Sequence, residues 1–142
     1  MSTEMDPDFP VVTGDYVMMK GWRVNLRGDF NRRIDEGSLV LWQPALTFWI
    51  EVWDSEGLVS VDEVLQRLLA DAGPDRIEER LVKNGAMVRL TYELPADVVP
   101  SPKLINSFII YPSGYMHLST YYDGPDARTL AYTIIESVRA EA

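Results

Sequence analysis

Three short turn signals, each between two apolar segments, constrain the fold of this chain more than any other feature. They are Gln43-Pro44-Ala45, Asn84-Gly85 and Pro112-Ser113-Gly114, and the segments beside them alternate apolar and polar residues. Alternation with a period of two is typical of strands that bury one face. Because turns this short join antiparallel neighbours, and a parallel crossover needs a dozen or more residues, we predict three antiparallel hairpins, with a type I′ turn at Asn84-Gly85. This pattern argues against a parallel nucleotide-binding sheet.

The N-terminal part of the chain divides into a leader and a first strand. Residues 1–15 are acidic and show little periodicity, so we expect a loosely ordered leader that becomes ordered near residues 9–12. Trp22, Val24 and Leu26 then alternate with polar residues, as in a strand. The polar stretch 28–37 is expected to turn the chain. The predicted organisation is therefore a leader, 1–15, followed by a single domain, 16–142.

Two helices complete the predicted elements. Ser60 and Glu63 have the spacing of a capping box, and apolar residues then recur at helical spacing until Gly73 and Pro74. Pro125 suits the first turn of a second helix, which carries an apolar stripe. The elements together predict an α+β fold, an αβ sandwich in which helices pack on an antiparallel sheet built from hairpins.

The composition excludes several classes of function. The chain has no cysteine, which rules out disulfides, zinc knuckles and thiol nucleophiles. Its formal net charge of −9, with dispersed basic residues, argues against nucleic acid as a ligand. An acidic surface would favour a basic protein partner, although such a charge is also an ordinary aid to solubility. No apolar run has membrane-spanning length and the acidic N-terminus lacks an apolar signal segment, so we predict a cytoplasmic location without membrane contact.

No motif for a metal or a cofactor is present in the sequence. The aspartates of the leader lack the glycine and terminal glutamate of a calcium loop, and the glycines do not form a phosphate-binding loop. We therefore predict no metal and no cofactor.

His117, the only histidine, is the one candidate for acid–base catalysis. No carboxylate is near it in the sequence, a nucleophile elbow is absent, and the adjacent acidic pairs point in different directions. A packing or surface histidine is the simpler interpretation, so no catalytic residue is assigned.

Aromatic residues are the best candidates for a binding site. Several lie on the predicted sheet face opposite the most apolar one, and clusters of Trp and Tyr mark binding hot spots when they are exposed. The candidate binding residues are Trp49, Trp53, Arg89, Tyr115, His117 and Tyr121. The commoner arrangement is that the second helix or the leader covers such residues, because large exposed apolar patches are rare on monomers.

The segment 107–139, SFIIYPSGYMHLSTYYDGPDARTLAYTIIESVR, resembles the closing hairpin and terminal helix of the Mog1/PsbP/DcrB-like superfamily. The segments 37–54 and 60–72 fit the same plan more loosely, so the resemblance covers roughly residues 20–140. Members of that superfamily are generally binding or accessory proteins: a nuclear-transport GTPase factor, photosystem extrinsic subunits, bacterial lipoproteins, and chaperones or immunity-type proteins. The resemblance implies a non-enzymatic, protein-binding role, and no functional residue of the family can be carried over to this chain.

Three functional hypotheses follow. The first is a cytosolic protein-binding or accessory protein, chaperone-, adaptor- or immunity-like, that uses the aromatic sheet face. The second is a small enzyme or ligand-binding protein that uses His117 with a carboxylate brought near by folding. The third is a homodimer in which the aromatic face is structural.

Overall fold

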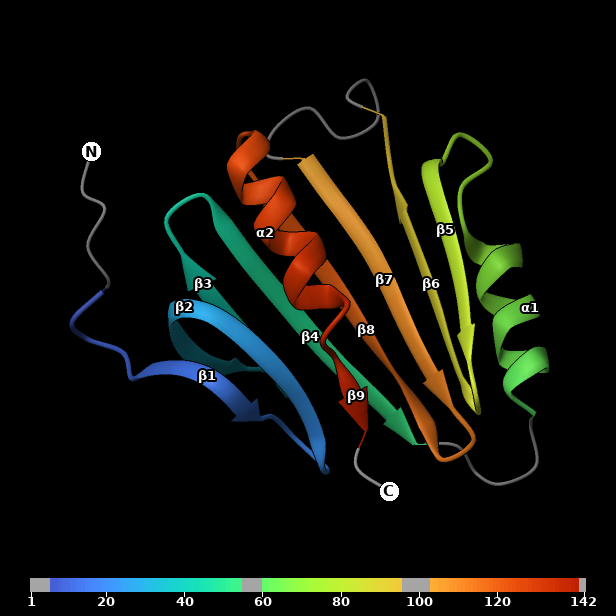
Figure 1. Ribbon diagram of the computed structural model, residues 1–142, viewed down its shortest axis with the longest axis horizontal. Coiled ribbons are helices and arrows are strands. Elements are labelled where there is room, and N and C mark those ends of the chain that lie inside the picture. The colour runs from blue at the N-terminus through green and yellow to red at the C-terminus, as the bar shows by residue number, and fades with distance from the viewer. Residues whose placement is uncertain (1–5, 55–59, 96–102, 141–142) are drawn as a thin grey trace.

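The computed structural model describes residues 6–54, 60–95 and 103–140 and places them in one antiparallel sheet with two helices (Figure 1). The elements are β1 (Val11–Val17), β2 (Trp22–Asp35), β3 (Ser38–Gln43), β4 (Leu46–Asp54), α1 (Val61–Asp71), β5 (Ile77–Asn84), β6 (Met87–Glu93), β7 (Lys103–Tyr111), β8 (Gly114–Tyr122), α2 (Pro125–Ile135) and β9 (Arg139–Ala140). The strands lie in the order β1-β2-β3-β4-β8-β7-β6-β5, and β9 pairs with β2. The predicted α+β class with an antiparallel sheet is confirmed.

The two helices pack on opposite faces of the sheet. Ile109 of β7 and Met116 of β8 belong to the same buried cluster as Ala131 of α2. Phe108, the next residue along β7, belongs instead to a second cluster with Leu65 of α1. Because successive side chains of a strand point to opposite faces, α1 and α2 must lie on different sides. The α1 cluster is the smaller one and lies over β6 and β7.

Both predicted helices are present, with the expected signals at their starts. The Ser60 side chain accepts a hydrogen bond of 3.1 Å from the backbone N–H of Glu63, which satisfies one of the free donors at the start of α1. Pro125 is the first residue of α2, as its fixed φ favours. Neither helix of the described part of the chain is long and apolar enough to cross a membrane.

Two of the three predicted hairpin turns form as expected. The loops are Pro44–Ala45 and Pro112–Ser113, each two residues long. At the third hairpin Asn84 pairs with Met87, so the loop is Gly85–Ala86, one residue later than predicted. Only Gly85 has a positive φ there, 60°, as a type II′ turn requires at its first central position. The predicted type I′ turn at Asn84-Gly85 is therefore wrong.

The expectation for the polar stretch 28–37 was also wrong, because most of it continues β2. Phe30 is fully buried in the stretch, and Asp35 pairs with Ser38 of β3. The turn is confined to Glu36 and Gly37, which both have a positive φ, 50° and 88°, as in a type I′ hairpin. Several residues here stay exposed, as Gly28 and Asp29 do, and the buried Asn31 is hydrogen-bonded to the N-terminal segment. Figure 1 shows β2 strongly curved, which carries its first half over the α2 side of the sheet.

Residues 11–15, assigned from the sequence to the leader, belong to strand β1. Asn31 of β2 anchors this part of the chain: its amide oxygen accepts from the backbone N–H of Asp6, and its amide nitrogen donates to the carbonyl of Phe9. β1 alternates exposed and half-buried residues throughout, but Val11 and Val17 lie on its exposed face, so its apolar residues do not alternate in the sequence. The ordered sheet therefore begins at Val11 and not at residue 16.

Candidate functional site

Five of the six predicted binding residues lie on one face of the central strands. The register of β4 and β8 places Trp53 opposite Tyr115, Glu51 opposite His117 and Thr47 opposite Tyr121. Directly paired residues share a face, and so do residues two apart on one strand. We call this surface the aromatic face and define it by Trp49, Trp53, Tyr115, His117 and Tyr121.

The aromatic face is partly open. Helix α2 packs on the other side of the sheet. Helix α1 packs on the same side as the aromatic face, over β6 and β7, and Tyr115 contacts its cluster. Within the described residues the N-terminal segment reaches only the margin, where Phe9 meets Trp42 edge-on with ring centroids 5.0 Å apart. Trp53 is 41% exposed and is one of the large exposed hydrophobic side chains. The second helix therefore does not cover these residues.

Arg89, the sixth predicted residue, lies on the opposite face. It pairs with Ile109, whose side chain packs in the α2 cluster. Its guanidinium donates to the backbone carbonyl of Glu136 at 3.5 Å, just beyond the end of α2. Arg89 is therefore no part of the aromatic face.

His117 contacts neutral polar and aromatic side chains. Its Nε2 lies 3.1 Å from Oδ1 of Asn106 and 3.4 Å from Oγ of Ser119, and its ring stacks on Phe108 with centroids 4.3 Å apart. Burial lowers the pKa of His117 to about 4. No described carboxylate hydrogen-bonds to the ring, although the enzyme hypothesis requires one. His117 is therefore a neutral packing side chain at physiological pH.

Two aromatic pairs on this side of the sheet differ in what lies over them. The guanidinium carbon of Arg33 lies 5.1 Å from the ring centroid of Trp42 and 5.6 Å from that of Trp49. Trp53 and Tyr115 stack with centroids 5.1 Å apart and planes at 18°. The cation–π contacts of the described residues involve other rings and leave this second pair without a cation.

A second candidate site lies on the α2 side of the sheet and is centred on Glu93, a 5% exposed residue at the end of β6. The hydroxyls of Tyr122 and Tyr132 donate to its two carboxylate oxygens at 2.5 and 2.6 Å. Arg128 of α2 donates through Nε at 3.1 Å and Nη2 at 2.7 Å. Burial alone would raise the pKa of Glu93, but the hydrogen bonds from Arg128, Tyr122 and Tyr132 outweigh it and hold that pKa below its usual value.

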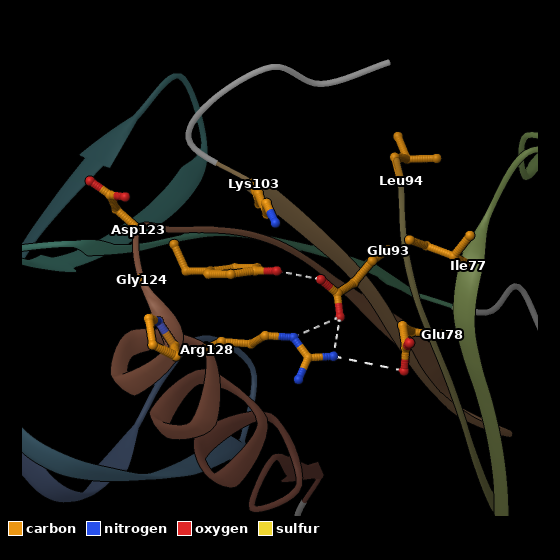
Figure 2. A pocket seen from close by; sticks show the side chains of 10 residues that line it. Ile77, Glu78, Glu93, Leu94, Lys103, Asp123, Gly124 and Arg128 are labelled. Atoms are coloured by element: carbon orange, nitrogen blue, oxygen red, sulfur yellow. Dashed lines mark hydrogen bonds and ion pairs between the residues drawn. The ribbon is translucent and has the colours of Figure 1, made fainter. Parts of the chain in front are cut away.

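The Glu93 cluster forms one wall of a pocket of about 570 Å³ (Figure 2). Glu78 also lines it, from a β-bulge in β5 where its φ is +55°, and its carboxylate lies 3.8 Å from Nη2 of Arg128. Figure 2 shows Arg128 reaching between Glu93 and Glu78, so that both carboxylates face one guanidinium. The charged groups at the centre are thus already paired with one another, and their evident effect is to fix α2 against the sheet.

This cluster was not predicted from the sequence. Glu93 and Thr91 alternate with apolar residues along β6 and so suggested a polar face, whereas both are buried and Arg128 and Tyr132 of α2 hydrogen-bond to Glu93. One usable signal was present, because Arg128 and Tyr132 are four residues apart and so share one face of the predicted helix. Nothing in the sequence connected that face to β6. Within the described residues no three carboxylate or imidazole side chains gather as metal ligands.

Comparisons with known proteins identify a fold but no family. A scan against protein-family models finds no match. A search of curated proteins finds none either. Among solved structures, this chain is similar to a crystal structure at 1.50 Å resolution of a protein from Bacteroides thetaiotaomicron VPI-5482, with a TM-score of 0.59 and 19% identity. The match covers 92% of this chain and 50% of that one, so this chain spans about half the length of its structural neighbour. A likeness at this identity is evidence for the fold alone.

Proposed function

We propose that this protein is a non-enzymatic, cytosolic binding or accessory protein that holds a protein partner on its aromatic face. The observation that carries the proposal is Trp53, a large aromatic side chain near the end of β4 that is 41% exposed and stacks on Tyr115. Helix α1 packs on this side of the sheet but over β6 and β7, and Trp53 stays open. Trp and Tyr at such positions are the residues that most often dominate binding energy. A chaperone-, adaptor- or immunity-like role fits this surface.

The chemistry of the remaining side chains supports binding rather than catalysis. His117 is neutral and lacks a carboxylate partner among the described residues, which removes the support for the enzyme hypothesis. The Glu93 carboxylate already accepts four hydrogen bonds from Tyr122, Tyr132 and Arg128, so its charge is engaged within the fold. The resemblance of residues 107–139 to the Mog1/PsbP/DcrB-like superfamily, with its many accessory proteins, points the same way.

The test compares two alanine variants of exposed apolar residues. Trp53→Ala removes the centre of the proposed site, and Ile34→Ala, at a residue 55% exposed on β2, is the matched control. Tagged protein is used to capture partners from lysate of the source organism, and the recovered proteins are quantified by mass spectrometry. We expect one stoichiometric partner with the wild type and with Ile34→Ala, and its loss with Trp53→Ala, while the melting temperature of all three stays similar.

Two outcomes would contradict the proposal. If Trp53→Ala retains the partner, the aromatic face is not the binding site. If Trp53→Ala unfolds the protein, the indole is a packing residue despite its exposure. Light scattering of the protein alone separates the homodimer alternative, because a dimer that dissociates in Trp53→Ala would make the same face a contact between two copies.

A further inference from the structure

The aromatic face already contacts one cation of its own chain, at Trp49. Arg33 of β2 pairs with Val40 of β3, and Val40 pairs with Trp49 of β4, so the three share one face. The guanidinium consequently lies over both Trp42 and Trp49. Indole rings attract a cation through their negative faces, and Arg is the cation most often used. The Trp42–Trp49 pair therefore binds an arginine, and the Trp53–Tyr115 pair offers aromatic rings of the same kind.

The Trp53–Tyr115 pair offers similar rings with carboxylates beside them. Glu51 lies two residues before Trp53 on the same face of β4, and Asp71 lies at the end of α1. Tyr115 packs against the α1 cluster, which includes Ala72, the residue next to Asp71. Burial raises the pKa of Tyr115, and the negative charges of Asp71 and Glu51 raise it further. Both are exposed, and neither forms an ion pair with a described residue.

Charge decides which occupant suits this surface. An acidic partner would meet Glu51, Asp71 and a chain of net charge −9, so its approach is repelled. A second copy of this chain would bring the same two carboxylates toward their own counterparts, which disfavours a symmetric dimer through this face. A basic segment gains from the rings and from the carboxylates together.

We propose that the partner places an Arg or Lys side chain over the ring of Trp53, between Glu51 and Asp71, so that the docked surface of the partner is basic. This inference rests on the proposed function, because it specifies the chemistry of the partner at the same aromatic face. Cation–π attraction supplies the contact, and the two carboxylates supply steering and selectivity for positive charge.

The experiment uses a defined probe and NMR of the whole protein. The peptide acetyl-Gly-Ser-Arg-Gly-Ser-Arg-Gly-amide is titrated to about 10 mM, a range that suits weak binding. Its control has citrulline, a neutral analogue of similar shape, in place of each Arg. The readout is the indole N–H signal of Trp53, assigned by its loss in Trp53→Phe. We expect the Arg peptide to move this signal. The citrulline peptide is expected to bind at least about fivefold more weakly.

Charge variants separate a local effect from a global one. Glu51→Gln with Asp71→Asn removes one carboxylate near Trp53 and one near Tyr115, and Asp29→Asn with Glu36→Gln removes two on β2 and its following turn. We expect the first pair to weaken binding of the Arg peptide about fivefold, and the second pair to leave it nearly unchanged.

Three results would overturn the inference. Equal binding of the Arg and citrulline peptides would mean that the face accepts a peptide without selecting charge, which leaves the proposed function intact. If both double variants weaken binding of the Arg peptide equally, the net charge of the protein causes the effect and not the two carboxylates Glu51 and Asp71. No movement of the Trp53 signal would remove the cation site, and the capture experiment with Trp53→Ala then decides the proposed function by itself.

Discussion

The Glu93 cluster gives the sharpest prediction about stability. Glu93→Gln keeps the shape of the side chain and removes the negative charge on which four donors converge. A hydrogen bond to a charged group contributes about 1.5–3 kcal/mol, and removing one member of a buried ion pair costs about 3–5 kcal/mol. Because the side chain of Arg128 is 35% exposed and can regain water, the lower end applies. We expect Glu93→Gln to lower the free energy of unfolding by about 3 kcal/mol at pH 7.

The pH dependence distinguishes the charge from the shape of the side chain. The pKa of Glu93 is lowered in the folded state, so the unfolded chain binds a proton first as the pH falls. The stabilisation is therefore complete above about pH 4.3, the usual pKa of Glu, and is lost as the pH falls through the folded value. Urea unfolding of wild type and Glu93→Gln from pH 7 to pH 3 should show a gap that closes only at the acidic end.

A matched control uses a carboxylate in an exposed ion pair. Glu79 of β5 pairs with Arg76, and its side chain is 43% exposed. Glu79→Gln should cost less than about 1 kcal/mol, because water and salt screen such pairs. A Glu93→Gln variant that lies within about 0.5 kcal/mol of the wild type at pH 7, or a gap that stays constant down to pH 3, would refute the reasoning.

Three further predictions concern the fold and His117. Ser60→Ala, which removes the cap of α1, should lower the free energy of unfolding by about 1 kcal/mol in urea titrations, and no loss would mean that water replaces the cap equally well. Phe48→Ala should cost about 3–5 kcal/mol by the same measurement, because Phe48 is 1% exposed; a cost near that of a surface change would contradict its place in the core. The ring of His117 should stay neutral down to about pH 4 in an NMR titration. Since its folded pKa is below the unfolded value of about 6.5, stability should fall between pH 6.5 and 4, and this fall should be absent in His117→Gln; titration near 6.5 would contradict the burial.

Local signals were sufficient for most individual elements. The α1 cap, the Pro125 start of α2 and two of three hairpin loops follow from short stretches of sequence, because each depends on φ preferences and hydrogen bonds within a few residues. The errors lie where these local preferences do not decide the position or type of a turn. The type of the β5–β6 turn depends on pairing across both strands, and the true turn at Glu36-Gly37 was hidden inside a polar stretch that looked like one long loop.

The sequence predicted correctly which candidate residues share a face within β4 and within β8, but not the placement of Arg89 on β6. Alternation along β4 and β8 correctly grouped Trp53 with Trp49 and Tyr115 with His117, because the side-chain period of a strand is fixed. Arg89 was misplaced because β6 is joined to this pair through β7, and its register cannot be read from alternation alone.

The sequence by itself determined the antiparallel α+β class, the two helices and the presence of an alternating aromatic strand face, since all of these depend on neighbours in the chain. Only the tertiary structure decided that β8 pairs with β4, that α1 and α2 lie on opposite faces, and that Glu93 meets Arg128 and two tyrosines. These contacts join residues more than twenty-five positions apart. They are settled by which faces can be buried together, a property of the packed sheet rather than of any segment in it.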